Sequence, residues 1–167
     1  MKKILLGLTV LLSGCISMTH IAETSGIESE ILKTVPKNAT EVILKKDVSA
    51  IDLYNELYSS LLSRGHRIDR DDKERFYITT QGKDVGQSTL QRSTIVVTED
   101  SGTSTAVIRS EWKPGTTATL GGSMFAGVGI SADWEKATWA ETGRPQIAMA
   151  EAIAIAYGVK GAVISFK

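Results

Sequence analysis

Two neighbouring stretches with a strand-like alternation constrain the fold of this chain more than any other feature. Residues 91–99 and 103–112 are rich in β-branched side chains, and Ser101-Gly102 between them is typical of a turn. In the second stretch one face is mostly apolar and the other is mostly polar. The two sets are Ala106, Ile108, Ser110 and Trp112, and Thr105, Val107, Arg109 and Glu111. We therefore expect an antiparallel sheet that is covered on one side only.

Further strands are predicted on both sides of this pair. The expected segments are residues 40–45, 66–69, 75–81 and, as a short last strand, 162–166. Residues 132–141 permit either a strand or a helix, and we expect a strand because their side chains alternate over several positions.

A first long helix is predicted after Ser49, which suits an N-cap because Asp52 follows three residues later. Gly65 is a natural stop for this helix. Its apolar stripe is expected to consist of Ile51, Tyr54, Leu57, Tyr58 and Leu61.

A second long helix is predicted over residues 146–157, with Pro145 at its first position and Gly158 at its end. Glu151 is its only charged residue, so we expect the helix to be largely buried. The fold class is therefore α+β. We expect an antiparallel sheet with two main helices packed on one face, in the order β-α-β-β-β-β-(β)-α-(β). This order resembles that of small helix-on-sheet modules in bacterial envelope lipoproteins.

The N-terminus has the pattern of a secretory signal. Lys2 and Lys3 precede an apolar run over residues 4–12, which is far shorter than the roughly 20 residues that cross a bilayer. The run ends in Leu12-Ser13-Gly14-Cys15, which resembles the lipobox of bacterial lipoproteins at all four positions.

The resemblance implies that cleavage makes Cys15 the first residue of the mature protein, with a diacylglyceryl group on its sulfur and fatty acyl chains such as palmitate. Two acyl chains suffice for stable anchoring. Ile16, rather than Asp, follows the cysteine. In Gram-negative sorting this favours the outer membrane, facing the periplasm.

Three regions follow from these patterns. Residues 1–14 are expected to be the signal peptide, residues 15–39 the lipidated cysteine and a tether, and residues 40–167 a single α+β domain. Ile27, Ile31 and Leu32 within the tether are spaced to form one helical turn that docks onto the domain.

Composition and charge exclude several classes of function. Without its signal lysines the chain has 17 basic against 19 acidic residues, which does not suit a nucleic-acid binder. Cys15 is the only cysteine, so lipidation leaves none for a disulfide or a cysteine-based metal site. The glycine pair Gly122 and Gly127 has phosphate-loop spacing but lacks the lysine that must follow. We expect no catalytic residues, metal or cofactor.

One group of side chains in the last third remains a candidate for binding. It consists of Trp112, Phe125, Trp134 and Trp139. Core packing is the default for such residues, and an exposed aromatic patch for binding is the alternative. We therefore expect a membrane-anchored, non-catalytic binding or envelope-assembly module with an envelope protein as its possible partner. The alternatives are a carrier of an apolar ligand such as a lipid, or an unrecognised carboxylate-based hydrolase.

Overall fold

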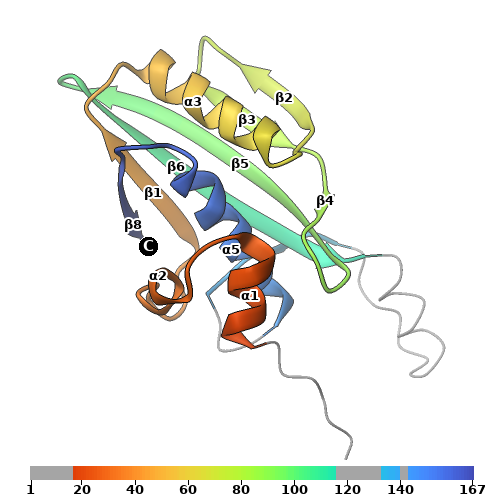
Figure 1. Cartoon of the computed structure of the whole chain (residues 1–167). Coiled ribbons are helices and arrows are strands. Elements are labelled where there is room, and N and C mark those ends of the chain that lie inside the picture. The colour runs from red at the N-terminus through yellow and green to blue at the C-terminus, as the bar shows by residue number, and fades with distance from the viewer. Residues whose placement is uncertain (1–16, 116–132, 140–142) are drawn as a thin grey trace, which may run out of the picture.

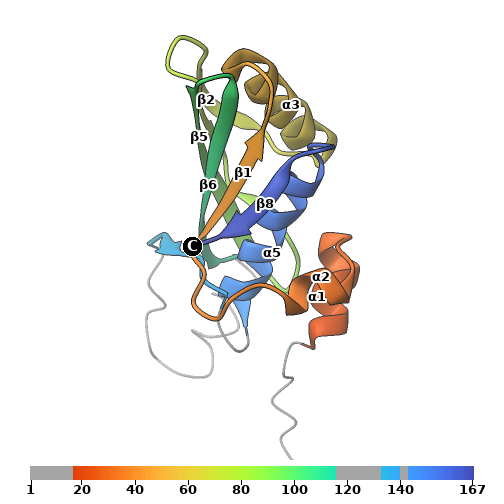
Figure 2. The same ribbon diagram turned by 90° about the vertical axis from the view of Figure 1, so that its left-hand side faces the viewer.

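The computed structural model of the chain describes residues 17–115, 133–139 and 143–167. It has an antiparallel sheet with helices on one face (Figures 1 and 2). The helices are α1 (Met18–Ser25), α2 (Ser29–Lys33), α3 (Ala50–Ser63) and α5 (Arg144–Tyr157). The strands are β1 (Glu41–Lys46), β2 (Ile68–Asp72), β3 (Tyr77–Thr80), β4 (Lys83–Asp84), β5 (Thr89–Asp100), β6 (Thr103–Pro114), β7 (Glu135–Lys136) and β8 (Val163–Phe166). The predicted α+β class and its approximate order of elements are confirmed.

The sheet is arranged around the long β5–β6 hairpin. Its order is β2-β3-β5-β6-β1-β8, with β4 beside β5 and β7 beside β6, and every pairing is antiparallel. At the hairpin tip Ser101 and Gly102 have φ angles of 52° and 83°. Positive φ at both central residues matches the right-handed twist of the strands, which is why glycine suits this turn.

The alternation in β6 is confirmed. Ala106, Ile108 and Ser110 are buried under the helices, and Arg109 on the opposite face is exposed. Trp112 is on the same inner face and packs against the core, but it lies near the end of β6 and is only half-buried.

Helix α3 begins and ends as predicted. The Ser49 hydroxyl accepts a hydrogen bond from the Asp52 amide, and Gly65 adopts a φ of 77° just beyond the last turn. The stripe is rotated from the expected one, because Leu53 is fully buried whereas Ile51 is 40% exposed. Tyr54, Leu57 and Leu61 face the core as predicted.

Helix α5 is buried from Gln146 to Ala156, as expected because Glu151 is the only charged residue in that stretch. Five of these residues are alanines, whose small side chains let the helix lie close to its neighbours. Its carbonyls accept bonds from other elements: the Ser60 hydroxyl of α3 donates to Ile155 O at 2.8 Å, and the Ser110 hydroxyl of β6 donates to Ala148 O at 3.3 Å.

The tether expected over residues 15–39 is not a tether from residue 18 onward. Helices α1 and α2 pack onto the domain, and α2 coincides with the helical turn expected there (Figure 1). The reason is burial of apolar side chains that are sparse in sequence but fall on one side when folded. They are Ile21, Ile27, Leu32 and Val35. Helices α1 and α2 are therefore part of the folded domain. Cys15 and the expected signal peptide lie outside the described residues.

The segment expected as a strand over residues 132–141 contains only the short β7 among its described residues. It pairs with the end of β6, Lys136 opposite Glu111 and Glu135 opposite Trp112. The short last strand is present as β8.

Candidate functional site

The three tryptophans predicted to gather in one patch lie in different environments. Trp139 is 6% exposed, and its backbone bonds to Asn38 and Ala39 beside the start of β1. Trp112 is half-buried on the helix side of the sheet. Trp134 lies on the opposite face, so the expected aromatic surface does not form among them. Phe125, the fourth member, lies outside the described residues, as does Cys15.

Trp134 is held by two cations. The Arg92 guanidinium carbon lies 4.5 Å from the ring centroid and the Lys113 ammonium 4.8 Å, both within the range of a cation–π contact. Gly82 lies against the ring edge, where a Cβ atom would stand 2.9 Å from a ring carbon. The ring thus forms one wall of the sheet face that faces away from the helices.

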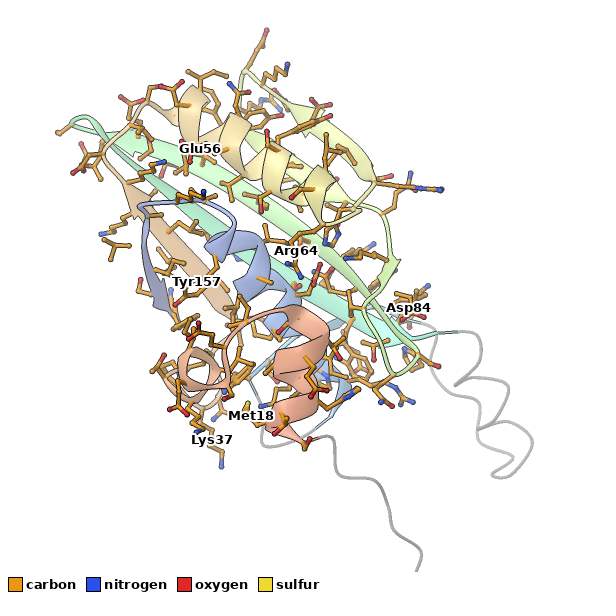
Figure 3. The ribbon with its side chains drawn as sticks, in the orientation of Figure 1. Met18, Lys37, Glu56, Arg64, Asp84 and Tyr157 are labelled. Carbon is orange, nitrogen blue, oxygen red and sulfur yellow. The ribbon has the colours of Figure 1, made fainter. Side chains whose placement is uncertain are left out.

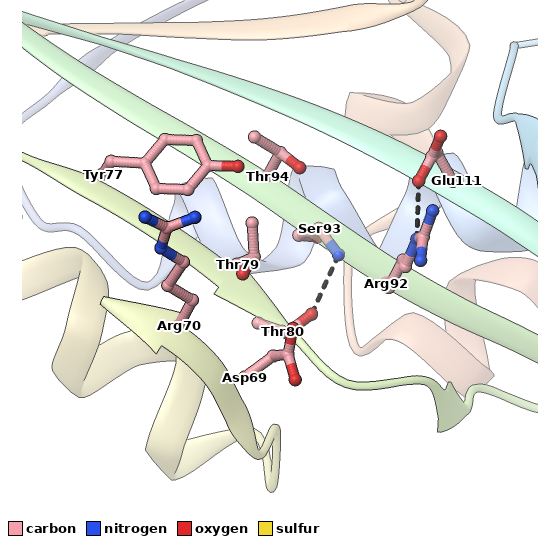
Figure 4. Close-up of a pocket in the computed structure, with 9 residues that line it drawn as sticks. All are labelled: Asp69, Arg70, Tyr77, Thr79, Thr80, Arg92, Ser93, Thr94 and Glu111. Atoms are coloured by element: carbon pink, nitrogen blue, oxygen red, sulfur yellow. Dashed lines mark hydrogen bonds and ion pairs between the residues drawn. The ribbon is translucent and has the colours of Figure 1, made fainter. Parts of the chain in front are cut away.

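This face, the open face, is formed by the outward side chains of β2, β3, β5 and β6 and is not covered by any described helix (Figure 2). It carries a hollow of about 290 Å³ (Figure 4). The hollow is lined by Asp69, Arg70, Tyr77, Thr79, Thr80, Arg92, Ser93, Thr94 and Glu111. A second hollow adjoins it toward Arg75 and Val96, and a third toward Arg109 and Lys136. The open face therefore has a polar groove, and its first hollow is lined by two arginines, Arg70 and Arg92, and two carboxylates, Asp69 and Glu111.

The two arginines of the hollow differ in their partners. Arg92 Nε donates to Glu111 Oε2 at 2.6 Å across the β5–β6 pair. Arg70 extends from β2 toward Tyr77 (Figure 4), and within the described part of the chain it has no ion-pair partner. A planar guanidinium with unused donors suits a carboxylate or phosphate, and the nearby hydroxyls of Thr79 and Thr94 add further donors.

The helix side of the sheet contains a second polar group, centred on Glu151 of α5. Glu151 is 4% exposed. Its Oε1 lies 2.8 Å from both His66 Nε2 and Lys83 Nζ, and its Oε2 lies 2.6 Å from Arg64 Nη2. Burial alone would raise the pKa of Glu151, but hydrogen bonds from His66, Arg64 and Lys83 outweigh it and hold the pKa far below its usual range.

The cluster around Glu151 joins elements that are distant in sequence. Arg64 lies at the end of α3 (Figure 3) and also donates to the Ser25 carbonyl of α1 at 3.0 Å. Lys83 of β4 donates to the Arg64 carbonyl at 2.6 Å. A carboxylate that stays ionised and whose oxygens are occupied is poorly suited to donate or accept a proton. We interpret the cluster as structural. Its one sequence signal was the single charge in an apolar helix.

Two findings bear on other kinds of site. Among residues 17–115, 133–139 and 143–167 there is no group of three or more His, Cys, Asp or Glu side chains placed to hold a metal ion. None of the helices described is both long enough and apolar enough to cross a membrane.

Comparison with known proteins gives no further assignment. No model of a protein family matches this sequence, and no curated protein matches it at a significant level.

Proposed function

We propose that the protein is a lipid-anchored, non-catalytic binding module of the bacterial cell envelope, held at the periplasmic face of the outer membrane through Cys15. The anchor is supported by Leu12-Ser13-Gly14-Cys15 and the apolar run before it. The binding role is supported by the open face, where a groove contains the Arg70 guanidinium, which has no ion-pair partner among the described residues. The other face of the same sheet is covered by the protein's own helices.

The hollow favours contact over catalysis. Five hydroxyls line it, those of Tyr77, Thr79, Thr80, Ser93 and Thr94, and none of them has a hydrogen bond to a histidine or carboxylate among the described residues that would activate it. A partner with a carboxylate or phosphate group would instead meet Arg70 and these donors directly. Such a partner is an envelope protein with an acidic segment.

The two alternatives lack a comparable observation. A carboxylate-based hydrolase needs an acid or base poised to exchange a proton. Arg64, His66 and Lys83 occupy both oxygens of the buried carboxylate Glu151, and of the two carboxylates that line the hollow, Asp69 and Glu111, the second is bound to Arg92. A carrier of an apolar ligand needs space between helices and sheet. There the alanines of α5 pack closely, and Gln91, Ser93 and Ser110 make the sheet beneath them polar.

The anchor is tested by Cys15→Ser. We expect this variant to lose both its lipid, measured by incorporation of labelled fatty acid, and its place in the membrane fraction. Normal processing and retention of Cys15→Ser in the membrane fraction would refute the lipoprotein assignment.

The binding role is tested by photo-crosslinking in cells. A crosslinking amino acid at Thr94, on the open face, is expected to capture one discrete protein. The same amino acid at Ser59, exposed on α3, is the matched control and is expected to capture none. Equal capture at both positions, or none at Thr94 when the protein is abundant, would contradict the proposal.

A further inference from the structure

We infer that the lipidated protein stands end-on upon its membrane. The N-terminus of α1 and the β4–β5 turn then face the lipid, and the β5–β6 turn points away. This orientation rests on the proposed lipidation of Cys15 and adds to it a defined membrane-facing end. Three features of the molecule set this orientation: the length of chain between Cys15 and α1, the attachment of α1 to the domain, and the position of α1 along the sheet.

The first feature is the short length of chain between the lipidated cysteine and the fold. The Ser17 hydroxyl accepts a hydrogen bond from the His20 amide at 3.2 Å and so caps the start of α1. Ser17 is two positions after Cys15, with only Ile16 between them, and a fully extended chain advances at most about 3.6 Å per residue. Whatever path the backbone takes, the Cα atom of Ser17 therefore lies within about 7 Å of the Cα atom of Cys15, the residue whose sulfur carries the lipid.

The second feature is that α1 is packed firmly against the rest of the domain. Ile21 is 1% exposed in the core, and Arg64 donates to the Ser25 carbonyl at 3.0 Å. On its other side α1 meets the β4–β5 turn. Gln87 Nε2 lies 3.0 Å from His20 Nε2, and a Cβ atom at Gly86 would stand 2.9 Å from the Thr24 methyl. Contacts at both ends of the helix fix its direction relative to the sheet.

The third feature is the position of α1 at one end of the long strands β5 and β6. Gln87 precedes β5, whose twelve residues rise about 40 Å before the turn at Ser101. At that far end Ser104 Oγ donates to Val48 O at 2.6 Å, which places the β1–α3 connection beside the turn. Figures 1 and 2 both show α1 at the opposite end of the sheet from this turn.

Together these three features predict that β5 and β6 rise from the membrane. The open face is then directed sideways, along the plane of the bilayer. The partner that fits this placement is a protein that stands on or in the same membrane and exposes an acidic segment within about 40 Å of it. A flexible tether of 25 residues, as the sequence suggested, would have left the orientation free.

The orientation is tested with full-length lipidated protein in vesicles of phosphatidylethanolamine and phosphatidylglycerol that contain a nitroxide-headgroup lipid. One variant carries Lys37→Cys, at the end where Met18 lies (Figure 3), and the other Asp100→Cys, at the far end of β5. Both side chains are exposed, and Cys15 is blocked by its lipid, so a maleimide fluorophore labels only the new thiol. We expect several-fold stronger quenching at Lys37→Cys than at Asp100→Cys.

A third variant tests whether α1 sets the orientation. Ile21→Asp places a charge in the core position of α1 and should release the helix, so the two probes should then quench alike. Equal quenching without Ile21→Asp would overturn the orientation, and so would a difference that survives it.

Flotation of the same vesicles reports on the anchor separately. Failure of the protein to float would overturn the lipid anchor and the orientation together, whereas flotation with equal quenching overturns the orientation alone.

Discussion

Arg64 and Glu151 form a buried ion pair across 87 positions of sequence, with Arg64 Nη2 2.6 Å from Glu151 Oε2. The pair joins the end of α3 to the middle of α5, and the same guanidinium reaches α1 through the Ser25 carbonyl. One side chain thus holds the N-terminal helix to the body of the domain. This contact links the stability of the fold to the placement of the proposed membrane anchor.

Removal of the carboxylate should therefore destabilise the protein strongly. Glu151→Gln leaves Arg64 and Lys83, both mostly buried, without their counter-charge, so we expect the free energy of unfolding to fall by about 3 kcal/mol. The matched control is Glu56→Gln, which breaks the more exposed pair with Lys46 and should lower it by less than about 1 kcal/mol. Urea denaturation measures both. Equal effects would mean that the buried cluster is no more important than a surface pair.

The same cluster predicts how stability responds to acid. The folded state holds the pKa of Glu151 far below its ordinary value of 4.5, so below that pH the unfolded chain binds a proton that the folded one does not. Stability should therefore fall as the pH falls through about 4.5, and this one group adds a slope of up to about 1.4 kcal/mol per pH unit. Denaturation curves at several pH values should show a shallower slope for Glu151→Gln and an unchanged one for Glu56→Gln. A slope that Glu151→Gln leaves unaltered would contradict the role given to this carboxylate.

Gly158, at the end of α5, should tolerate no side chain despite a φ angle of −66° that any residue can adopt. A Cβ atom there would overlap the Ser60 hydroxyl of α3. Gly158→Ala should destabilise the protein by about 1–3 kcal/mol, although Gly→Ala at a helix end without such a neighbour is usually tolerated. Adding Ser60→Ala removes the nearest obstructing atom. The double variant should be more stable than the sum of the single changes predicts, as thermal or chemical unfolding can show. Strict additivity would exclude this contact as the cause.

The contrasting positions of two tryptophans make a further prediction. Trp139→Ala opens a cavity in the core and should lower the free energy of unfolding by about 4 kcal/mol. Trp134→Ala removes contacts with Arg92 and Lys113 on the open face and should lower it by only about 1 kcal/mol. Parallel urea titrations compare the two. Similar losses in the free energy of unfolding would show that Trp134 stabilises the fold by more than its two cation–π contacts explain.

The unpaired arginine of the hollow should matter for binding rather than for folding. Arg70→Ala is expected to reduce crosslinking from Thr94 several-fold while changing the free energy of unfolding by less than about 0.5 kcal/mol. Arg75→Ala, in the neighbouring hollow, is the control, because its side chain is 81% exposed and makes only a long contact with Asp72. If both substitutions leave crosslinking intact, the partner does not use the guanidinium groups of this groove.

The parts of the fold that sequence alone determined are those decided by neighbours along the chain. The alternation in β6, the turn at Ser101-Gly102, the cap at Ser49 and the stop at Gly65 follow from backbone geometry over a few residues. Each was found where it was expected. The burial of α5 also followed locally, because residues 146–157 of this helix contain only one charged residue and so have no face that prefers water.

Only the tertiary structure decided what long-range contacts control. Residues 18–35 looked like a tether because their few apolar side chains are widely spaced, and they fold because Ile21 and Leu32 find a core surface offered by other elements. The three hydrogen-bonding partners of Glu151 are residues 64, 66 and 83, and no local pattern links them to α5. Trp134 is separated from Trp112 because β7 pairs with β6 in a register that sends adjacent side chains to opposite faces. Sequence identified the two long helices, the main strands and the residue expected to carry the lipid, but not α1 or β4. The hollow on the open face and the membrane-facing end depend on non-local pairing, whose free energy exists only once the chain has folded.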